Sequence, residues 1–303
     1  MPHEETRSFL SHLARLDPPS LLLSGGEPMT HPKFFDLLNM ASDLGLRLSL
    51  STNGTLIDAS AARSLKDRVG YVGVSLDGLE ETHDAFRGTA GAFQKTLSGI
   101  ENLRSSGVRV GLRFTMARPL LHEISDIMKL SEELGVDRIC FYHFIPSGRG
   151  NADLTPARSE IRSVLDALIE WVDGGKAPKE VLTVGNFSDG VLLYLRLLER
   201  GDARAEKALS LIKRGKKHGI VSVRWDGMLF ADQFSWRLPP LGRWQDLENH
   251  VSASVGAIPA FGGRCGTCRW RALCRGNMRA RAAAAGNPLG EDPGCVLMDG
   301  EIA

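Results

Sequence analysis

Leu21-Leu22-Leu23-Ser24-Gly25-Gly26-Glu27-Pro28 joins a short apolar run to a loop that carries two glycines and a carboxylate. The run Leu21–Leu23 predicts a buried strand, and the loop predicts a turn at its carboxyl end. A helix should follow, because the apolar residues from Phe34 to Leu44 fall on one face and Gly45 suits a helix C-terminus. The stretch is therefore the first unit of a strand–helix pattern.

The same alternation continues through the first half of the chain. Further strands are predicted over residues 46–50, 71–76, 108–114 and 138–144, which gives five in all. Strands that alternate with helices are typical of parallel βαβ units in a barrel or an open α/β sheet. The helix predicted over residues 9–16 should follow a strand that the chain does not contain.

Beyond Gly174 the pattern changes. Residues 191–213 predict a charged helix, and residues 221–231 predict a hairpin that turns at Asp226-Gly227. This hairpin opens a cysteine-rich tail. We therefore expect an α/β domain over residues 1–175, a linker or helical segment over 176–220 and a small domain over 221–303.

Composition excludes several classes of protein. The chain has 303 residues, with 37 Lys and Arg against 36 Asp and Glu, which leaves a net charge of +1. With 43% hydrophobic residues it is neither a disordered chain nor a basic nucleic-acid tail. It contains no apolar run of membrane-spanning length, and its acidic start is unlike a signal peptide. We expect a cytoplasmic protein.

The loops after the strands are the expected ligand site, because ligands of parallel α/β proteins bind at the carboxyl ends of the strands. Gly25 and Gly26 would let the backbone approach a ligand closely, and Pro28 would stiffen the loop. Glu27 would accept a hydrogen bond from a ligand ammonium or hydroxyl group. A glycine-rich turn with a solvated glutamate explains the pattern equally well.

Later strands add polar side chains to the same edge. Ser75 and Asp77 share one face and suit a ribose or a carboxylate, although a strand-terminal turn is an equal alternative. Asn53-Gly54 is typical of a turn. Arg113 on an inward face needs an anion, and we favour a ligand carboxylate over a structural ion pair. His143, at the end of the last strand, is expected to be structural.

Four of the five cysteines follow the pattern Cys265-x2-Cys268-x5-Cys274-x20-Cys295. Four thiolates suit either a tetrahedral zinc ion or one [4Fe–4S] cluster, and the spacing does not decide between them. Arginines surround them, and four of these are candidate ligands for substrate carboxylates or phosphates: Arg269, Arg275, Arg279 and Arg281. The alternatives are a solvated basic helix face and a nucleic-acid-binding zinc ribbon, and the near-zero net charge argues against the ribbon.

Three motifs, at residues 24–28, 51–54 and 74–78, resemble consecutive strand-end motifs of the radical S-adenosylmethionine (SAM) enzymes. The resemblance implies a partial (β/α)6 TIM-like barrel in which Glu27 holds the amino group of SAM and Ser75 and Asp77 contact its ribose and carboxylate. The full set of expected cofactor contacts is Gly25, Gly26, Glu27, Pro28, Asn53, Ser75, Asp77 and Arg113. The tail resembles the SPASM or twitch extension, which implies one auxiliary [4Fe–4S] cluster on Cys265, Cys268, Cys274 and Cys295 rather than zinc.

Residues 77–87, 111–116 and 147–151 and the arginine-rich tail look most like the NirJ-type enzymes of heme d1 biosynthesis and related heme-pathway enzymes. This likeness implies an iron tetrapyrrole substrate whose propionate side chains are modified through a 5′-deoxyadenosyl radical. It also implies an electron donor such as a flavodoxin or ferredoxin, and neither nucleic acid nor membrane as a partner. Peptide-modifying SPASM maturases share much of the pattern and are the alternative.

One departure from the family concerns its Cys-x3-Cys-x2-Cys loop, which binds the cluster that cleaves SAM. The chain has no such motif, since its fifth cysteine is the isolated Cys140. We therefore expect a barrel without its first strand and cluster loop, and a polypeptide that cannot cleave SAM. A truncated start, with the second [4Fe–4S] cluster only in a full-length parent, is the simpler explanation. A non-catalytic iron–sulfur or zinc scaffold protein is the alternative.

Overall fold

A computed structural model describes residues 1–18, 20–147, 150–215, 220–253 and 260–303. They divide into two compact units. The sheet unit consists of Pro2–Tyr142 and Trp171–Leu182, and the tail unit of Met1, His143–Glu170 and Thr183–Ala303. This division does not follow the predicted boundaries at 175 and 220. Gly148 and Arg149, within the heme-enzyme resemblance at 147–151, lie outside the described residues.

The main sheet has six strands in chain order. They are β1 (Leu21–Leu23), β2 (Leu48–Thr52), β3 (Val69–Ser75), β4 (Val110–Met116), β5 (Arg138–His143) and β6 (Glu180–Val184). Strands β1 to β4 pair in parallel, so the predicted α/β class is confirmed. The predicted count of five was wrong, because β6 was assigned to a linker. Its side chains are partly buried or exposed, and its sequence Glu180-Val181-Leu182-Thr183-Val184 has no more than two apolar residues in a row.

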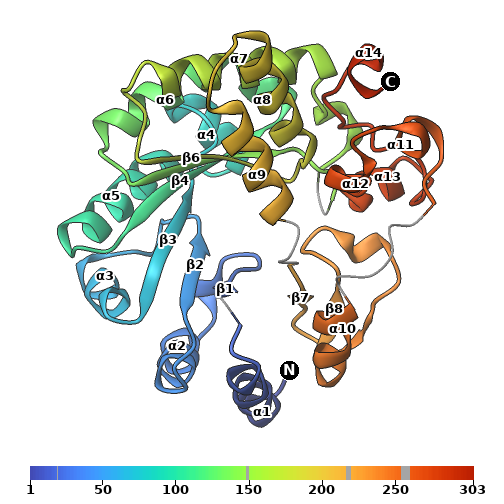
Figure 1. The fold of residues 1–303 in the computed structure, drawn as a ribbon. Coiled ribbons are helices and arrows are strands. Elements are labelled where there is room, and N and C mark those ends of the chain that lie inside the picture. Colours follow the sequence, from blue (N-terminus) through green and yellow to red (C-terminus); the bar gives the residue numbers. More distant parts are fainter. Residues whose placement is uncertain (19, 148–149, 216–219, 254–259) are drawn as a thin grey trace. The chain divides into compact units, whose positions relative to one another are not determined.

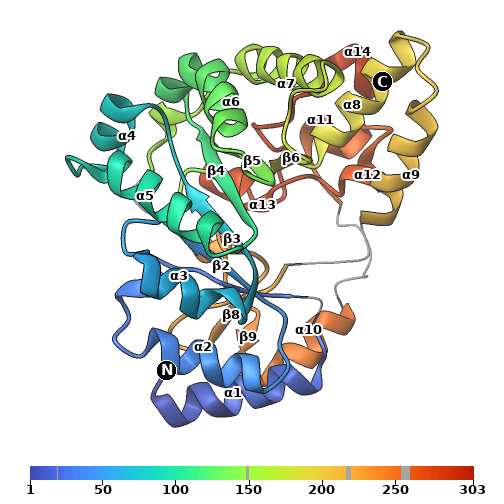
Figure 2. The same ribbon diagram turned by 90° about the vertical axis from the view of Figure 1, so that its left-hand side faces the viewer.

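Helices follow the strands, as the alternation predicted, and Figure 1 traces them in colour order from α1 to α6. Figure 2 shows α3 and α5 side by side along the strands. The helices and 3-10 turns of this part are α1 (His3–Arg15), η1 (Pro28–Thr30), α2 (Phe34–Asp43), α3 (Ala59–Lys66), α4 (Glu80–Arg87), α5 (Ala92–Ser105), η2 (Arg118–Glu123) and α6 (Ile124–Glu133).

The strands bury one face more completely than the other. On β2, Leu48, Leu50 and Thr52 are buried, whereas Ser49 and Ser51 between them are only half-buried. The fully buried Phe114 of β4 and Phe141 of β5 stack edge to face with ring centroids 6.0 Å apart. Because side chains alternate along a strand, the opposite face receives the polar residues of the sequence. That second face carries the candidate site.

The remaining elements are mostly short. They are η3 (Ala152–Leu154), α7 (Arg158–Asp173), α8 (Ser188–Glu199), α9 (Ala205–Gly215), β7 (Ser222–Val223), β8 (Met228–Phe230), η4 (Ser235–Arg237), β9 (Gly242–Arg243), η5 (Trp244–Asp246), α10 (Leu247–Ala253), α11 (Gly263–Thr267), α12 (Arg271–Cys274), α13 (Arg279–Ala284) and α14 (Asp299–Ile302). The predicted hairpin is confirmed, because β7 and β8 pair antiparallel around Gly227. Among the described residues, no helix combines the length and apolarity needed to cross a membrane.

Candidate functional site

Glu27 ties the loop after β1 to the loop after β2. Its Oε1 accepts hydrogen bonds from the Met29 amide at 3.1 Å and the Thr52 hydroxyl at 2.8 Å. Its Oε2 accepts one from the Asn53 amide at 2.7 Å. These donors fix the carboxylate in place and stabilise its charge, while a lone pair on Oε2 remains for a ligand cation.

The two glycines before Glu27 leave the loop open. Gly25 has φ +145°, which disfavours a side chain, and no atom lies within 4 Å of the position a Cβ would take at Gly25 or Gly26. Both glycines are exposed. A bare backbone beside a fixed carboxylate is a surface that a ligand amino-acid group can approach closely, and Pro28 continues it as the first residue of η1.

Asn53 forms a local turn. Its Oδ1 accepts hydrogen bonds from both the amide and the hydroxyl of Thr55, at 2.9 and 2.8 Å. The side chain is therefore engaged in the turn, and its backbone amide is the group that holds Glu27.

Asp77 is engaged inside the protein. Only 1% of it is exposed, its Oδ1 accepts the Thr115 amide at 2.7 Å and its Oδ2 is ion-paired with Arg87. The Asp77 amide donates to Nδ1 of His83 at 3.0 Å, which fixes the loop after β3 from the other side. Sequence reasoning gave Arg87 and His83 no role in the site, because neither belongs to the strand-end motif. Ser75, at the end of β3, stands half-buried opposite Arg113 of β4.

Arg113 reaches across the polar face of the sheet. Its Nη1 donates to the Ser51 hydroxyl of β2 at 2.7 Å, and its guanidinium lies 5.5 Å from the centre of the Tyr142 ring. The path between β4 and β2 crosses Gly73, where an added Cβ would come within 2.1 Å of Arg113 Nε. That Nε is buried and has no partner among the described residues. The guanidinium is therefore held by a neutral hydroxyl and a ring, and keeps capacity for an anion.

Arg109, by contrast, is neutralised. Glu180 of β6 accepts a hydrogen bond from Arg109 at 2.6 Å and is also ion-paired with Arg138. The two guanidiniums hold the pKa of Glu180 below its usual value against the opposing effect of burial. Since β6 was not predicted, this partner could not be foreseen. Because Arg109 already has an acidic partner, Arg113 is the better candidate of the two for binding a ligand anion.

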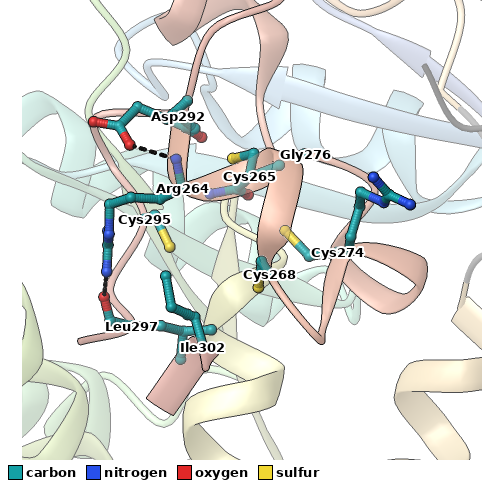
Figure 3. A pocket seen from close by; sticks show the side chains of 12 residues that line it. Arg264, Cys265, Cys268, Cys274, Gly276, Asp292, Cys295, Leu297 and Ile302 are labelled. Carbon is teal, nitrogen blue, oxygen red and sulfur yellow. Dashed lines mark hydrogen bonds between the residues drawn. The ribbon is translucent and has the colours of Figure 1, made fainter. Parts of the chain in front are cut away.

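The four tail cysteines lie around one pocket. Figure 3 shows Cys265, Cys268, Cys274 and Cys295 lining it together with Arg264 and the apolar side chains of Leu297 and Ile302. Burial raises the pKa of the Cys274 thiol far above its usual value, and the neighbouring cysteines add to the effect. Burial likewise raises the pKa of Cys295. The thiols of Cys274 and Cys295 are therefore harder to deprotonate than a free cysteine, and a bound cation would offset this effect.

The four tail cysteines could hold a metal centre. Four thiolates suit either a tetrahedral zinc ion or one [4Fe–4S] cluster. Arg264 and Arg271 also line the pocket and would offset the negative charge of such a centre. Four cysteines around one pocket are the kind of donor set that a [4Fe–4S] cluster uses.

The four candidate substrate arginines occupy different surroundings. Arg281 is 2% exposed and is bound to Asp292, which gives it a structural position. Arg279 donates to the carbonyls of Pro288 and Gly290 and lies over a phenylalanine ring. Arg275 is half-buried, and Arg269 is exposed above the Trp270 ring. Of the four, Arg269 is the most accessible to a ligand.

His143, expected to be structural, is buried in a polar network. Its Nε2 lies 2.7 Å from Asp189, and Asn186 approaches its other ring nitrogen at 3.4 Å. Asn186 also donates to the carbonyl of Gly294, next to Cys295. The network therefore reaches the loop that carries Cys295. The sequence did not indicate this connection, because the residues are far apart along the chain.

The fold agrees with what similar proteins show. The profile of the radical SAM superfamily matches residues 1–139. The Fe-coproporphyrin III synthase of Methanosarcina barkeri (strain Fusaro / DSM 804) is 39% identical over 325 residues, covering 99% of this chain and 81% of that protein. This chain belongs to the radical SAM superfamily.

One further relative and one solved structure are also similar to this chain. The pre-heme d1 synthase of Dinoroseobacter shibae (strain DSM 16493 / NCIMB 14021 / DFL 12) is 31% identical over 324 residues, covering 98% of this chain and 79% of that protein. Among solved structures, native anSMEcpe with bound AdoMet and Kp18Cys peptide matches with a TM-score of 0.68 at 20% identity, covering 97% of this chain and 86% of the other. At this identity the structural match supports the fold alone.

Proposed function

We propose that this chain is the body of a radical SAM enzyme of heme biosynthesis that acts on propionate side chains of a carboxylated iron porphyrinoid. The observation that carries the proposal is the 39% identity to an Fe-coproporphyrin III synthase along 99% of the chain. Similarity of that extent includes both the strand-end loops and the cysteine-rich tail. The peptide-modifying alternative is supported by lower sequence identity, 28% over 313 residues.

SAM would lie across the strand ends. Glu27, already fixed by Thr52 and Asn53, would bind the ammonium group of SAM, and the open backbone at Gly25 would lie against its methionyl part. Arg113 would hold the carboxylate with the donors that Ser51 leaves free. When bound, SAM supplies the 5′-deoxyadenosyl group from which the family generates its radical.

The cluster that cleaves SAM does not fit this chain. Its Cys-x3-Cys-x2-Cys ligands do not occur among the five cysteines of the sequence, so we assign no step of SAM cleavage to these residues. The four tail cysteines would instead hold one auxiliary [4Fe–4S] cluster. Arg264 and Arg271 would balance its charge, and Leu297 and Ile302 would keep water from it.

Ligand binding tests the proposal directly. The chain, reconstituted anaerobically with iron and sulfide, is titrated with iron coproporphyrin III and with the fully esterified form of the same compound, and binding is followed by the Soret band. We expect saturable binding of the carboxylate form and at least tenfold weaker binding of the ester, because charged hydrogen bonds contribute about 1.5–3 kcal/mol each. Equal affinity for both forms, or binding of neither, would contradict the proposal.

A further inference from the structure

A second, smaller pocket lies in the tail unit beside the loop that leads to Cys295. Thr155, which follows η3, and Arg158, the first residue of α7, contribute to it, and Pro293 and Gly294 form the side next to the cysteine. His143 and Arg281 complete its polar lining. All three ionisable side chains among its described lining residues are basic, and none is an acid.

Two of these basic groups already have acidic partners behind the pocket wall. His143 is paired with Asp189 at 2.7 Å, and Arg281 with Asp292 at 2.8 Å. Arg158 differs, because its Nε is buried and has no hydrogen-bond partner among the described residues. Buried donors are almost always satisfied in folded proteins, so this one points to an acceptor that the protein itself does not supply.

We propose that the pocket at Arg158 binds one carboxylate group of the ligand. The proposal rests on the proposed function, which supplies a ligand with several carboxylates. The Nε and one Nη of Arg158 would donate two parallel hydrogen bonds to the carboxylate oxygens, the geometry for which a guanidinium is suited. Because Gly294 directly precedes Cys295, a carboxylate held here would bring the ligand beside the proposed auxiliary cluster.

Arg158→Gln and Arg158→Lys test the pocket, and Arg214→Gln, which changes an exposed arginine of α9, is the matched control. We expect Arg158→Gln to weaken binding of iron coproporphyrin III about tenfold, Arg158→Lys to weaken it less, and the control to leave it unchanged. The fully esterified porphyrin should bind the wild type and Arg158→Gln equally. Unchanged affinity of Arg158→Gln for the carboxylate form would overturn the proposal while leaving the proposed function intact.

A second measurement separates the pocket from the porphyrinoid. The Nε–H signal of Arg158, assigned by its loss in Arg158→Lys, is followed by nuclear magnetic resonance while propionate is added to the wild-type protein. A saturable shift of this signal supports the carboxylate site even if no porphyrinoid binds, in which case only the proposed function fails. If propionate does not shift this signal, the proposed carboxylate site at Arg158 is wrong.

Discussion

Arg281 and Asp292 form a buried, two-pronged ion pair beneath the cysteine loop. Nε of Arg281 lies 2.9 Å from Oδ1 and Nη2 lies 2.8 Å from Oδ2 of Asp292, and the two side chains are 2% and 0% exposed. Asp292 also accepts the amides of Met278 and Gly294, at 3.0 and 2.8 Å. The pair therefore fixes the turn that presents Cys295, and Gly294 is needed there because a Cβ would come within 2.4 Å of Arg281.

Asp292→Asn should destabilise the tail and impair cluster assembly. The change leaves Arg281 as a buried charge without its counter-ion, which costs about 3–5 kcal/mol in comparable pairs. We expect a lower free energy of unfolding in urea and less iron per chain after reconstitution. Asp202→Asn, which breaks the more exposed pair with Arg204, serves as control and should change neither quantity appreciably. Equal effects of the two variants would refute the role assigned to Asp292.

The cysteine pocket makes a prediction about metal content. Anaerobic reconstitution should give about four irons per chain, with the broad absorption of a [4Fe–4S] cluster. Cys274→Ser should reduce the iron bound. Cys140→Ser should retain it, because Cys140 is buried in the sheet unit and does not line the pocket. Zinc bound without iron would instead revive the zinc-ribbon interpretation.

The contrast between Glu27 and Arg281 shows what the sequence could predict. The loop that carries Glu27 can be recognised from neighbouring residues alone, because a strand end, two glycines and a carboxylate follow one another along the chain. Arg281 was expected to contact substrate because the sequence shows a row of arginines but not which of them the fold buries. Asp77 resembles Arg281 in this respect. Its contacts with Arg87 and Thr115 depend on how α4 and β4 approach the strand end, which the sequence does not show.

Strand prediction failed for a related reason. Strands β1 to β5 were recognisable because each includes a run of apolar or alternating residues. Strand β6 contributes Glu180 as the partner of Arg109 and Arg138, so its place in the sheet is specified by charge as much as by apolar burial. An ion pair between distant residues leaves no periodic signal in the sequence.

Glu27→Gln should weaken SAM binding. Removing the charge removes the attraction for the ammonium group of SAM, and we expect a loss of about tenfold or more in affinity, measured by equilibrium dialysis. Thr52→Val is the comparison, because it deletes the hydrogen bond to Oε1 and the acceptor of the Gly54 amide but leaves the carboxylate charged. Similar losses in the two variants would show that loop geometry, rather than charge, governs binding.

His83 should make stability depend on pH. Burial, followed by the charge of Arg87, holds the pKa of His83 below its usual value near 6.5. As pH falls below about 6.5, the unfolded chain binds a proton that the folded chain resists, so this contribution to stability is complete above that pH and is lost with acid. His83→Asn, whose Oδ1 can still accept the Asp77 amide, should flatten the decrease between pH 7.5 and pH 5.5 in urea unfolding. A decrease of the same size in the variant would assign the effect to another group.

The 303-residue chain should bind SAM without cleaving it. The auxiliary cluster proposed here has all four irons ligated by cysteine, which leaves no iron open to the amino and carboxylate groups of SAM. With dithionite as reductant, we expect no 5′-deoxyadenosine by liquid chromatography, although the reconstituted protein retains SAM in dialysis. Cys295→Ser is the variant to compare with the unaltered chain. It removes one cysteine ligand, which frees one iron of the cluster, and it leaves Glu27 unchanged. Formation of 5′-deoxyadenosine by the unaltered chain, at a rate above that of free iron and sulfide, would show that the tail cysteines themselves support cleavage.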